Sequence, residues 1–156
     1  MKIIKPTAVI LLATTSMLAA LLSGCALNDS QYKNSALTKT ENTVILNDIW
    51  ALEAIKGDVI ELTSDTERPR LEIQLAEMRI MGTDGCNGYF GSIDFIDEQK
   101  INFGPIASTR KYCAEMTIPD SFGQQMHVVK TYQVENLKLR LFDEVGQEVL
   151  LFQKID

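Results

Sequence analysis

Four glycines spaced three residues apart constrain this chain more than any other feature. In residues 82–91, GTDGCNGYFG, glycine occupies every third position, and Cys86 and Asn87 lie between the middle pair. Glycine loses more conformational entropy on folding than any other residue and brings no side chain to a core. A run of this kind therefore predicts special backbone geometry, which means positive φ angles, a bulge or a close approach of two backbone segments.

The spacing of these glycines excludes the common phosphate-binding motifs. There is no G-x-G to begin a dinucleotide-binding fingerprint and no G-K-[ST] to end a Walker loop. Asp84 and Asn87 carry oxygen ligands that calcium accepts, but the spacing and the closing glutamate of an EF-hand loop are missing. The sequence favours a structural turn that brings Cys86 under a sheet, and it predicts no metal and no cofactor.

The first 24 residues have the three parts of a secretory signal peptide. Lys2 and Lys5 precede an apolar stretch, residues 8–22, which ends in small residues before Cys25. This stretch is shorter than the roughly 20 residues that cross a bilayer comfortably, which disfavours the alternative of an uncleaved signal anchor. We therefore expect residues 1–24 to be absent from the mature protein.

The end of this segment, Leu22-Ser23-Gly24-Cys25, closely resembles the bacterial lipobox. The resemblance implies that Cys25 is lipidated, becomes the new N-terminus and is acylated, and two or more acyl chains anchor a protein stably to a membrane. Ala26 stands where an aspartate would resemble an inner-membrane retention signal, so an outer-membrane lipoprotein facing the periplasm is favoured. Residues 25–43 are then the lipidated cysteine and a flexible tether, because residues 28–43 are polar, small and without periodicity.

Length and charge limit the function of the remaining chain. The sequence has 156 residues and a formal net charge of −6, which becomes more negative once the two lysines of the signal peptide are removed. An acidic product without a basic cluster argues against nucleic-acid binding and against electrostatic adhesion to anionic lipid. Residues 44–156 are long enough for one domain with a hydrophobic core.

Cys86 and Cys113 remain as an even pair once Cys25 is assigned to the lipid. In an oxidising compartment a disulfide is the default state of such a pair. Closing a loop of this length contributes about 3 kcal/mol or slightly more to stability in the chain-entropy model. The alternative is a pair of free thiols with redox or metal chemistry, although no C-x-x-C motif and no neighbouring histidine supports it.

Apolar periodicity predicts an α+β fold for residues 44–156. The 3–4 spacing of apolar residues after Pro119 predicts one main helix over residues 119–132. About seven short strands are expected near residues 48–52, 71–75, 78–80, 90–96, 101–103, 137–141 and 149–152. We predict a small antiparallel, barrel-like curled sheet whose opening is covered by the helix.

Local patterns predict turns and inward-facing side chains. A turn is expected at Gly57-Asp58. The apolar series changes parity at Ala76-Glu77, which requires a bulge or a looser turn there. The side chains expected to face the core include Trp50, Leu71, Ile73, Met78, Ile80, Ile93, Phe95, Leu137, Leu139 and Leu141.

The second notable segment is residues 106–113, IASTRKYC. Its hydroxyl groups and Arg110 can satisfy backbone groups or bind an anion. His127 is the only histidine and falls on the polar flank of the predicted helix, so no Ser-His-Asp or Cys-His set assembles. We predict that the protein is not an enzyme and has no catalytic residue, and that Asn87, Thr109 and Arg110 are candidate binding residues.

Two motifs follow one another along the chain, Gly85-Cys86-Asn87-Gly88-x-x-Gly91 and Ile106-Ala107-Ser108-Thr109-Arg110-x-x-Cys113. Together with an early Trp50, an aromatic-rich helix and a terminal Leu150-Leu151-Phe152, they resemble the META domain, the family of the heat-shock lipoprotein HslJ. The resemblance covers about residues 44–155. It implies a compact, barrel-like α+β fold in which the two motif segments lie side by side.

For function, the resemblance implies a role in the bacterial envelope, with heat inducibility and resistance to novobiocin and without an established reaction or ligand. The leading interpretation is a non-enzymatic, lipid-anchored module that supports outer-membrane integrity by binding an envelope partner of unknown identity. Two alternatives stay open. One is a small-ligand-binding barrel that uses Asn87, Thr109 and Arg110, and the other is a thiol-redox protein that uses Cys86 and Cys113.

Overall fold

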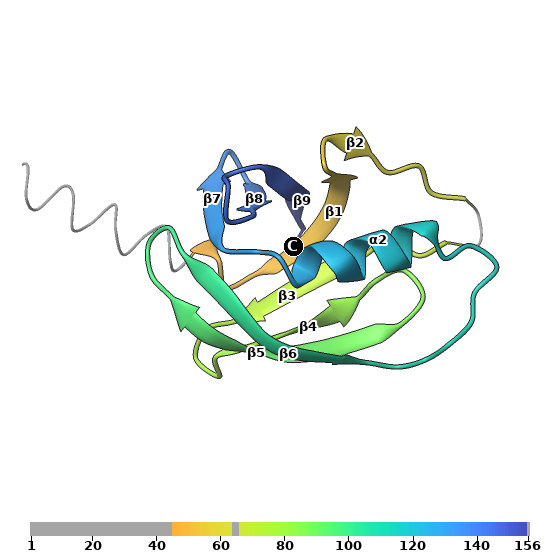
Figure 1. The fold of residues 1–156 in the computed structure, drawn as a ribbon, viewed down its shortest axis with the longest axis horizontal. Coiled ribbons are helices and arrows are strands. Elements are labelled where there is room, and N and C mark those ends of the chain that lie inside the picture. The colour runs from red at the N-terminus through yellow and green to blue at the C-terminus, as the bar shows by residue number, and fades with distance from the viewer. Residues whose placement is uncertain (1–44, 64–65, 156) are drawn as a thin grey trace, which may run out of the picture.

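A computed structural model describes residues 45–63 and 66–155, so the predicted signal peptide, Cys25 and the tether lie outside the described residues. In this part of the chain, nine strands form one antiparallel sheet, and the helix α2 (Thr117–Met126) packs against it (Figure 1). The strands are β1 (Ile49–Ile55), β2 (Asp58–Val59), β3 (Arg70–Gln74), β4 (Arg79–Thr83), β5 (Gly88–Ile96), β6 (Ile101–Ser108), β7 (Thr131–Glu135), β8 (Lys138–Phe142) and β9 (Glu148–Ile155).

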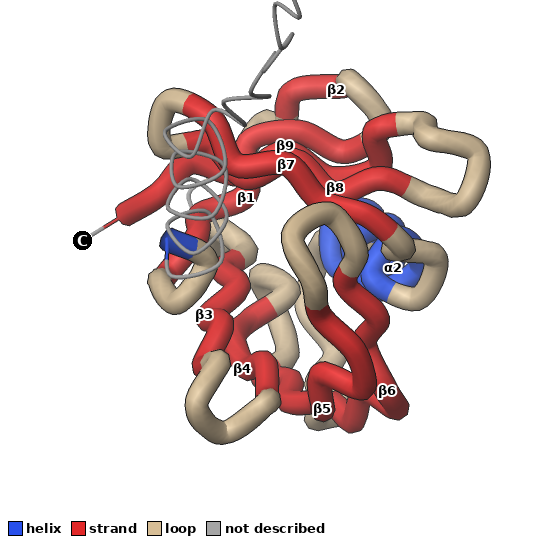
Figure 2. The backbone as a smooth tube through the Cα atoms, turned by 90° about the vertical axis from the view of Figure 1, so that its left-hand side faces the viewer, coloured by secondary structure: helices blue, strands red, loops and turns tan. Residues whose placement is uncertain are grey.

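The sheet is curled into a half-barrel. Its strands follow the order β6-β5-β4-β3-β1-β9-β8-β7, and β2 pairs with β1. The two outermost strands approach each other at one point, where Lys100 and Thr131 form an isolated bridge and the Ile101 N–H donates to the Lys130 carbonyl at 3.1 Å. Helix α2 lies between the two halves of the curled sheet (Figure 2) and contacts β1 and β9. The predicted curled antiparallel sheet with one main helix is confirmed.

Phe122 of α2 joins the two halves of the sheet through its ring. It packs edge-on against Phe152 of β9, with ring centroids 6.3 Å apart, and at a tilt against Tyr89 of β5, with centroids 5.6 Å apart. Phe122 and Phe152 are fully buried, as is Trp50 of β1, which confirms the predicted inward direction of the only tryptophan. The helix therefore fills the opening of the half-barrel with its apolar face.

The helix is shorter than predicted, because it ends at Met126 and not at residue 132. Residues 131–135 form β7, in which Tyr132 is buried and Val134 packs against the core. The apolar residues of this stretch fit a two-residue period as well as a helical one, and the sequence interpretation chose the wrong period. Strands β7 and β2 raise the number of strands from about seven to nine. No helix within the described residues is long and apolar enough to span a membrane.

Leu137 does not face the core as predicted, and its side chain is 57% exposed. Asn136 and Leu137 form the two-residue turn between β7 and β8, with φ angles of 53° and 61°. A type I′ hairpin turn requires positive φ at both central residues, which takes Leu137 out of the strand register. The first hairpin uses the same geometry at Lys56-Gly57, one residue earlier than predicted.

Two further side chains that were predicted to be internal are partly exposed. Phe95 is 46% exposed because the pairing of β5 with β6 is irregular on both sides of Ile93, after which Ile96 packs against the core. Met78 ends a four-residue loop between β3 and β4 at a φ of 50°, and Ile80 is the next buried residue. The sequence predicted either a bulge or a looser turn at Ala76-Glu77, and the structure has the looser turn.

Replacing Phe122 tests whether the helix side chain joins the sheet halves. We expect Phe122→Ala to lower the free energy of unfolding by about 3–5 kcal/mol, because it leaves a cavity between two aromatic rings. Urea denaturation followed by far-ultraviolet circular dichroism measures the loss. Phe95→Ala is the matched control, since this phenylalanine is 46% exposed, and its loss is expected to be much smaller. Equal losses for the two variants would contradict the assignment.

Candidate functional site

The two motif segments lie side by side, as the resemblance implied. The turn between β4 and β5, residues 84–87, and the first residue of β5 both contact the segment that follows β6: the Lys111 N–H donates to the Asn87 side chain at 2.7 Å, and the Thr109 N–H donates to the Gly88 carbonyl at 3.0 Å. Cys86 and Cys113 form a disulfide whose Cα atoms are 6.1 Å apart. The structure thus contains the cysteine pairing that the compartment argument predicted.

Asn87 holds the two segments together from within. Its side chain is 6% exposed, and its amide oxygen accepts hydrogen bonds from the Thr109 hydroxyl at 3.1 Å and from the Lys111 N–H at 2.7 Å. Its amide nitrogen donates to the Asp84 carboxylate at 3.3 Å. These contacts fix the backbone on both sides of Arg110. Asn87 therefore has a structural role, and contact of its side chain with a ligand stays a prediction.

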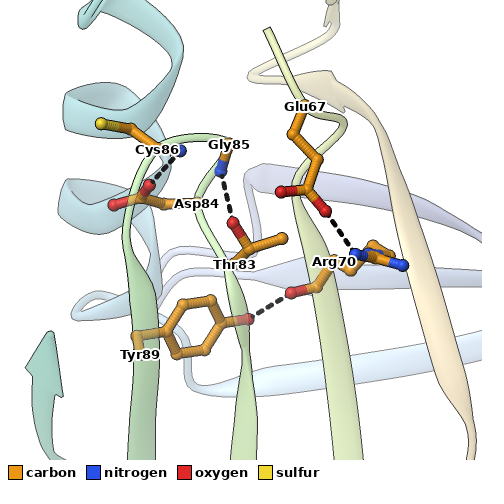
Figure 3. Close-up of polar contacts among 7 residues, drawn as sticks. All are labelled: Glu67, Arg70, Thr83, Asp84, Gly85, Cys86 and Tyr89. Carbon is orange, nitrogen blue, oxygen red and sulfur yellow. Dashed lines mark hydrogen bonds and ion pairs between the residues drawn. The ribbon is translucent and has the colours of Figure 1, made fainter. Parts of the chain in front are cut away.

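Asp84 shapes the turn between the strands. Its carboxylate accepts the N–H groups of Cys86 and Asn87, and its own N–H donates to the Asn87 carbonyl at 2.9 Å. The Gly85 N–H donates to the Thr83 hydroxyl at 3.1 Å in the same turn (Figure 3). An aspartate that binds backbone amides two and three residues ahead stabilises a tight turn. Among residues 45–63 and 66–155, no group of three or more His, Cys, Asp or Glu could hold a metal ion.

The glycines of residues 82–91 are required, where they are required at all, for different structural reasons. A Cβ at Gly82 would lie 2.0 Å from the Arg70 carbonyl oxygen. Gly85 has a φ of 101°, and a Cβ there would lie 2.8 Å from the Glu67 carbonyl oxygen. These two confirm the expected close approach and positive φ. At Gly88, by contrast, φ is ordinary, and a Cβ would meet only the carbonyl oxygen of Gly82, at 3.8 Å. The fold therefore does not require glycine at position 88.

Tyr89 lies beneath the turn, and the sequence interpretation did not single it out. Its hydroxyl donates to the Arg70 carbonyl at 2.9 Å (Figure 3), through the space that Gly82 leaves open. Burial raises the pKa of the Tyr89 hydroxyl well above its usual value, and the nearby charge of Asp84 raises it further. Tyr89 and Ile93 are both odd-numbered residues of β5, so their side chains point to the same, buried face of the sheet. This alternation is the sequence pattern from which the burial of Tyr89 could have been predicted.

Residues 109–112, which lie between the Asn87 hydrogen bonds and the disulfide, are exposed. Thr109 and Arg110 lie at the surface, and Tyr112 is 93% exposed. The hydrogen bonds of Asn87 hold this segment at residues 109 and 111, and the disulfide holds it at Cys113. Exposed cationic and aromatic side chains are thus presented by a backbone with little freedom.

A hollow of about 450 Å³ opens on the outer face of the sheet beside the disulfide. Its walls come from four separate parts of the chain, which is why no local sequence pattern revealed it. The residues that matter for its chemistry are Glu67, Arg70, Glu72, Thr83, Gly88 and Lys111.

The family model of the META domain matches residues 43–156, which include both motif segments, the disulfide and all nine described strands. This chain belongs to the META domain family. The match agrees with the resemblance inferred from the two motifs, and an HslJ-like protein is consistent with it. No curated protein matches this META-domain chain in sequence.

Solved structures share the fold of this META domain. One is a protein solved by NMR, with a TM-score of 0.55 and 18% identity, over 72% of this chain and 92% of that chain. Another is an NMR structure of a protein from Burkholderia xenovorans, with a TM-score of 0.56 and 19% identity, over 74% of this chain and 87% of that chain. At these identities the likeness establishes the fold alone.

Two glycine substitutions test which positions of the META domain require glycine. We expect Gly82→Ala to lower the free energy of unfolding by about 3 kcal/mol, because the new Cβ collides with the Arg70 carbonyl. Gly88→Ala is expected to be neutral or to stabilise by about 0.5–1 kcal/mol, since glycine is unfavourable inside a strand. Thermal and urea unfolding measure both values. A tolerated Gly82→Ala would show that the close approach does not constrain the fold.

The alkaline stability of the META domain tests the environment of Tyr89. Because the pKa of Tyr89 is raised in the folded state, its contribution is complete below about pH 10, the ordinary tyrosine pKa, and is lost as pH rises through the folded pKa. Tyr89→Phe should lose about 0.5–1.5 kcal/mol at neutral pH with the hydrogen bond to Arg70.

Urea unfolding at a series of pH values from about 8 to about 11, which spans the ordinary tyrosine pKa, measures this effect. The difference in stability between the wild type and Tyr89→Phe should shrink above about pH 10. Tyr112→Phe is the control, because Tyr112 is 93% exposed. Parallel curves for the wild type and Tyr89→Phe would show that the folded state does not favour the neutral phenol.

Proposed function

We propose that this META-domain protein is a lipid-anchored, non-enzymatic binding protein of the bacterial envelope, and that it supports outer-membrane integrity and resistance to antibiotics of the novobiocin type. In this proposal, residues 109–113 contact a protein partner in the periplasm. The observation that carries it is that the exposed Arg110 and Tyr112 lie in a segment held by the Asn87 hydrogen bonds and by the Cys86–Cys113 disulfide.

Rigid presentation favours binding. The hydrogen bonds from Thr109 and Lys111 to Asn87, together with the disulfide, order this segment before any partner arrives. A preordered segment loses less conformational entropy on association, which leaves more of the contact energy as affinity. Arginine and tyrosine are also enriched among the side chains that dominate binding at protein interfaces. Tyr112, at 93% exposure, has little to contribute to the fold itself.

The positions of the ionisable groups support binding more than catalysis. The Asp84 carboxylate is engaged by the amides of its own turn, and the Tyr89 hydroxyl is engaged by the Arg70 carbonyl. His127, the only histidine of the chain, is exposed and caps the C-terminal end of α2. The hydrogen-bond partners of Asp84 and Tyr89 are amide N–H groups and a carbonyl, so neither residue is placed as a general base beside a hydroxyl or thiol.

The anchor supports the envelope location. The signal peptide and the lipobox-like sequence before Cys25 are the basis for this part of the proposal. Lipid on Cys25 and a polar tether to residue 43 would keep the META domain near the membrane while leaving residues 109–113 free to meet a partner. Cys25→Ser removes the acylated sulfur and therefore tests the anchor separately from the contact segment.

Crosslinking in intact cells tests the contact segment in the full-length, lipidated protein. We expect Arg110→Ala combined with Tyr112→Ala to reduce the yield of the crosslinked partner at least tenfold, because both exposed contacts are lost. Val145→Ala is the matched control, since Val145 is an exposed apolar residue, at 86%, in the turn between β8 and β9.

Sensitivity to novobiocin and detergent after heat stress gives the second readout. Cells that carry the double variant should be as sensitive as cells that lack the protein, and the Val145→Ala cells should resemble the wild type. The proposal fails if deletion leaves this sensitivity unchanged. An unchanged crosslinking yield for the double variant would remove the contact segment from the proposal.

A further inference from the structure

Gly88 lines the hollow on the outer face without contributing a side chain. Gly88 begins β5 between Thr83 of β4, its pairing partner, and the segment that follows β6. Its φ is ordinary and a Cβ there would meet nothing closer than 3.8 Å, so the fold accepts a side chain at this position. Because side chains alternate along a strand and Tyr89 is buried, a side chain at position 88 would point to the outer face, where the hollow lies.

The floor of the hollow is held in place from below. The Tyr89 hydroxyl binds the Arg70 carbonyl, and Gly82 lets β4 approach that carbonyl closely. The Thr83 hydroxyl is fixed by the N–H of Gly85 in the adjoining turn. The site is therefore formed before a ligand arrives, as most small-molecule sites are.

Charges of both signs surround this floor. Arg70 forms an ion pair with Glu67, which neutralises one charge of each sign (Figure 3). Within the described part of the chain, neither Glu72 nor Lys111 takes part in an ion pair, and Glu72 accepts only a neutral amide donor from Gln74. Glu72 lies on β3, whereas Lys111 lies in the segment after β6 that runs beside the start of β5. Strands β3 and β5 are separated by β4 and are therefore about 10 Å apart. The hollow therefore offers a negative charge at one side and a positive charge at the other, neither of them neutralised.

We propose that this hollow binds a small zwitterion, in which a primary ammonium group lies a few bonds from a phosphate or carboxylate. Glu72 receives the ammonium group, and Lys111 receives the anionic group, with Thr83 and Arg70 beside them. Ethanolamine phosphate, which is also a lipid headgroup, and free amino acids share this chemistry. Lys111 adjoins the contact made by Arg110 and Tyr112, but its side chain lines the hollow, and binding of a small zwitterion is measured without the proposed partner.

Titration of the full-length protein in detergent micelles, followed by ¹H–¹⁵N NMR, tests the ligand class. O-phosphoethanolamine and alanine are the zwitterionic probes, and ethanolamine and inorganic phosphate are the single-charge controls. We expect a zwitterion to shift the amide signals of Gly82, Thr83 and Gly88 saturably, with at least tenfold higher affinity than either control.

The pattern of binding identifies the source of the ligand. Binding of O-phosphoethanolamine but not alanine indicates a headgroup, the reverse indicates an amino acid, and binding of both indicates recognition of the charge pair alone. The proposal is overturned if no probe gives a saturable shift, or if ethanolamine or phosphate binds as tightly as the zwitterion.

Variants separate the hollow from the fold. Gly88→Val should fill the hollow and weaken binding at least tenfold while leaving the unfolding temperature unchanged or higher. Gly123→Ala is the control glycine, because a Cβ there meets nothing within 4 Å and it lies in α2, outside the hollow. Unchanged affinity for Gly88→Val would overturn the site.

Charge variants decide the result if Gly88→Val fails to fold. Lys111→Gln keeps the backbone N–H that binds Asn87, and Glu72→Gln keeps the shape of the side chain. Each should weaken binding at least tenfold, and Lys100→Gln, on an exposed residue outside the hollow, should not. Wild-type affinity in both Lys111→Gln and Glu72→Gln would refute charge recognition.

Discussion

The connection between the β4–β5 turn and residues 109–113 is the constraint on which the rest of this META domain depends. A disulfide that closes a loop with a sequence separation of 27 contributes about 3.5 kcal/mol in the chain-entropy model. The partly buried hydrogen bonds that Asn87 accepts add about 0.5–1.5 kcal/mol each. Because α2 begins at Thr117, four residues after Cys113, this connection also limits where the helix can start. Phe122, in this helix, packs against Tyr89 and Phe152 of the two halves of the sheet.

The run of glycines illustrates how one residue type serves several physical purposes within ten residues. Gly82 of β4 lies so close to the Arg70 carbonyl of β3 that a Cβ would collide with it, and the buried Tyr89 of β5 reaches this carbonyl across β4. Gly85 takes the positive φ of the turn that presents Cys86. Gly88 meets neither requirement, and its effect is seen only at the surface, where it leaves space. Regular spacing in the sequence therefore does not imply one shared cause.

The sequence predicted the features that follow from short-range patterns. The inward direction of Leu71 and Ile73 follows from simple alternation, and the oxidised cysteine pair follows from compartment and count. Prediction failed where two local patterns compete or where a turn resets the register, as at residues 131–135 and at Leu137. The outer hollow could not be predicted, because its charged residues are brought together by strand pairing between β3, β4 and β5.

Lys111 belongs to both of the surfaces that this connection creates. Its backbone N–H is held by Asn87 between the exposed Arg110 and Tyr112, and its side chain lines the hollow beside Gly88. A shift of this backbone would therefore change the contact segment and the charge of the hollow together. Two sites that share an element are energetically coupled whenever the element moves, and the coupling is equal in both directions. The disulfide and the Asn87 hydrogen bonds oppose such movement, so the same contacts that stabilise the fold keep the two surfaces independent.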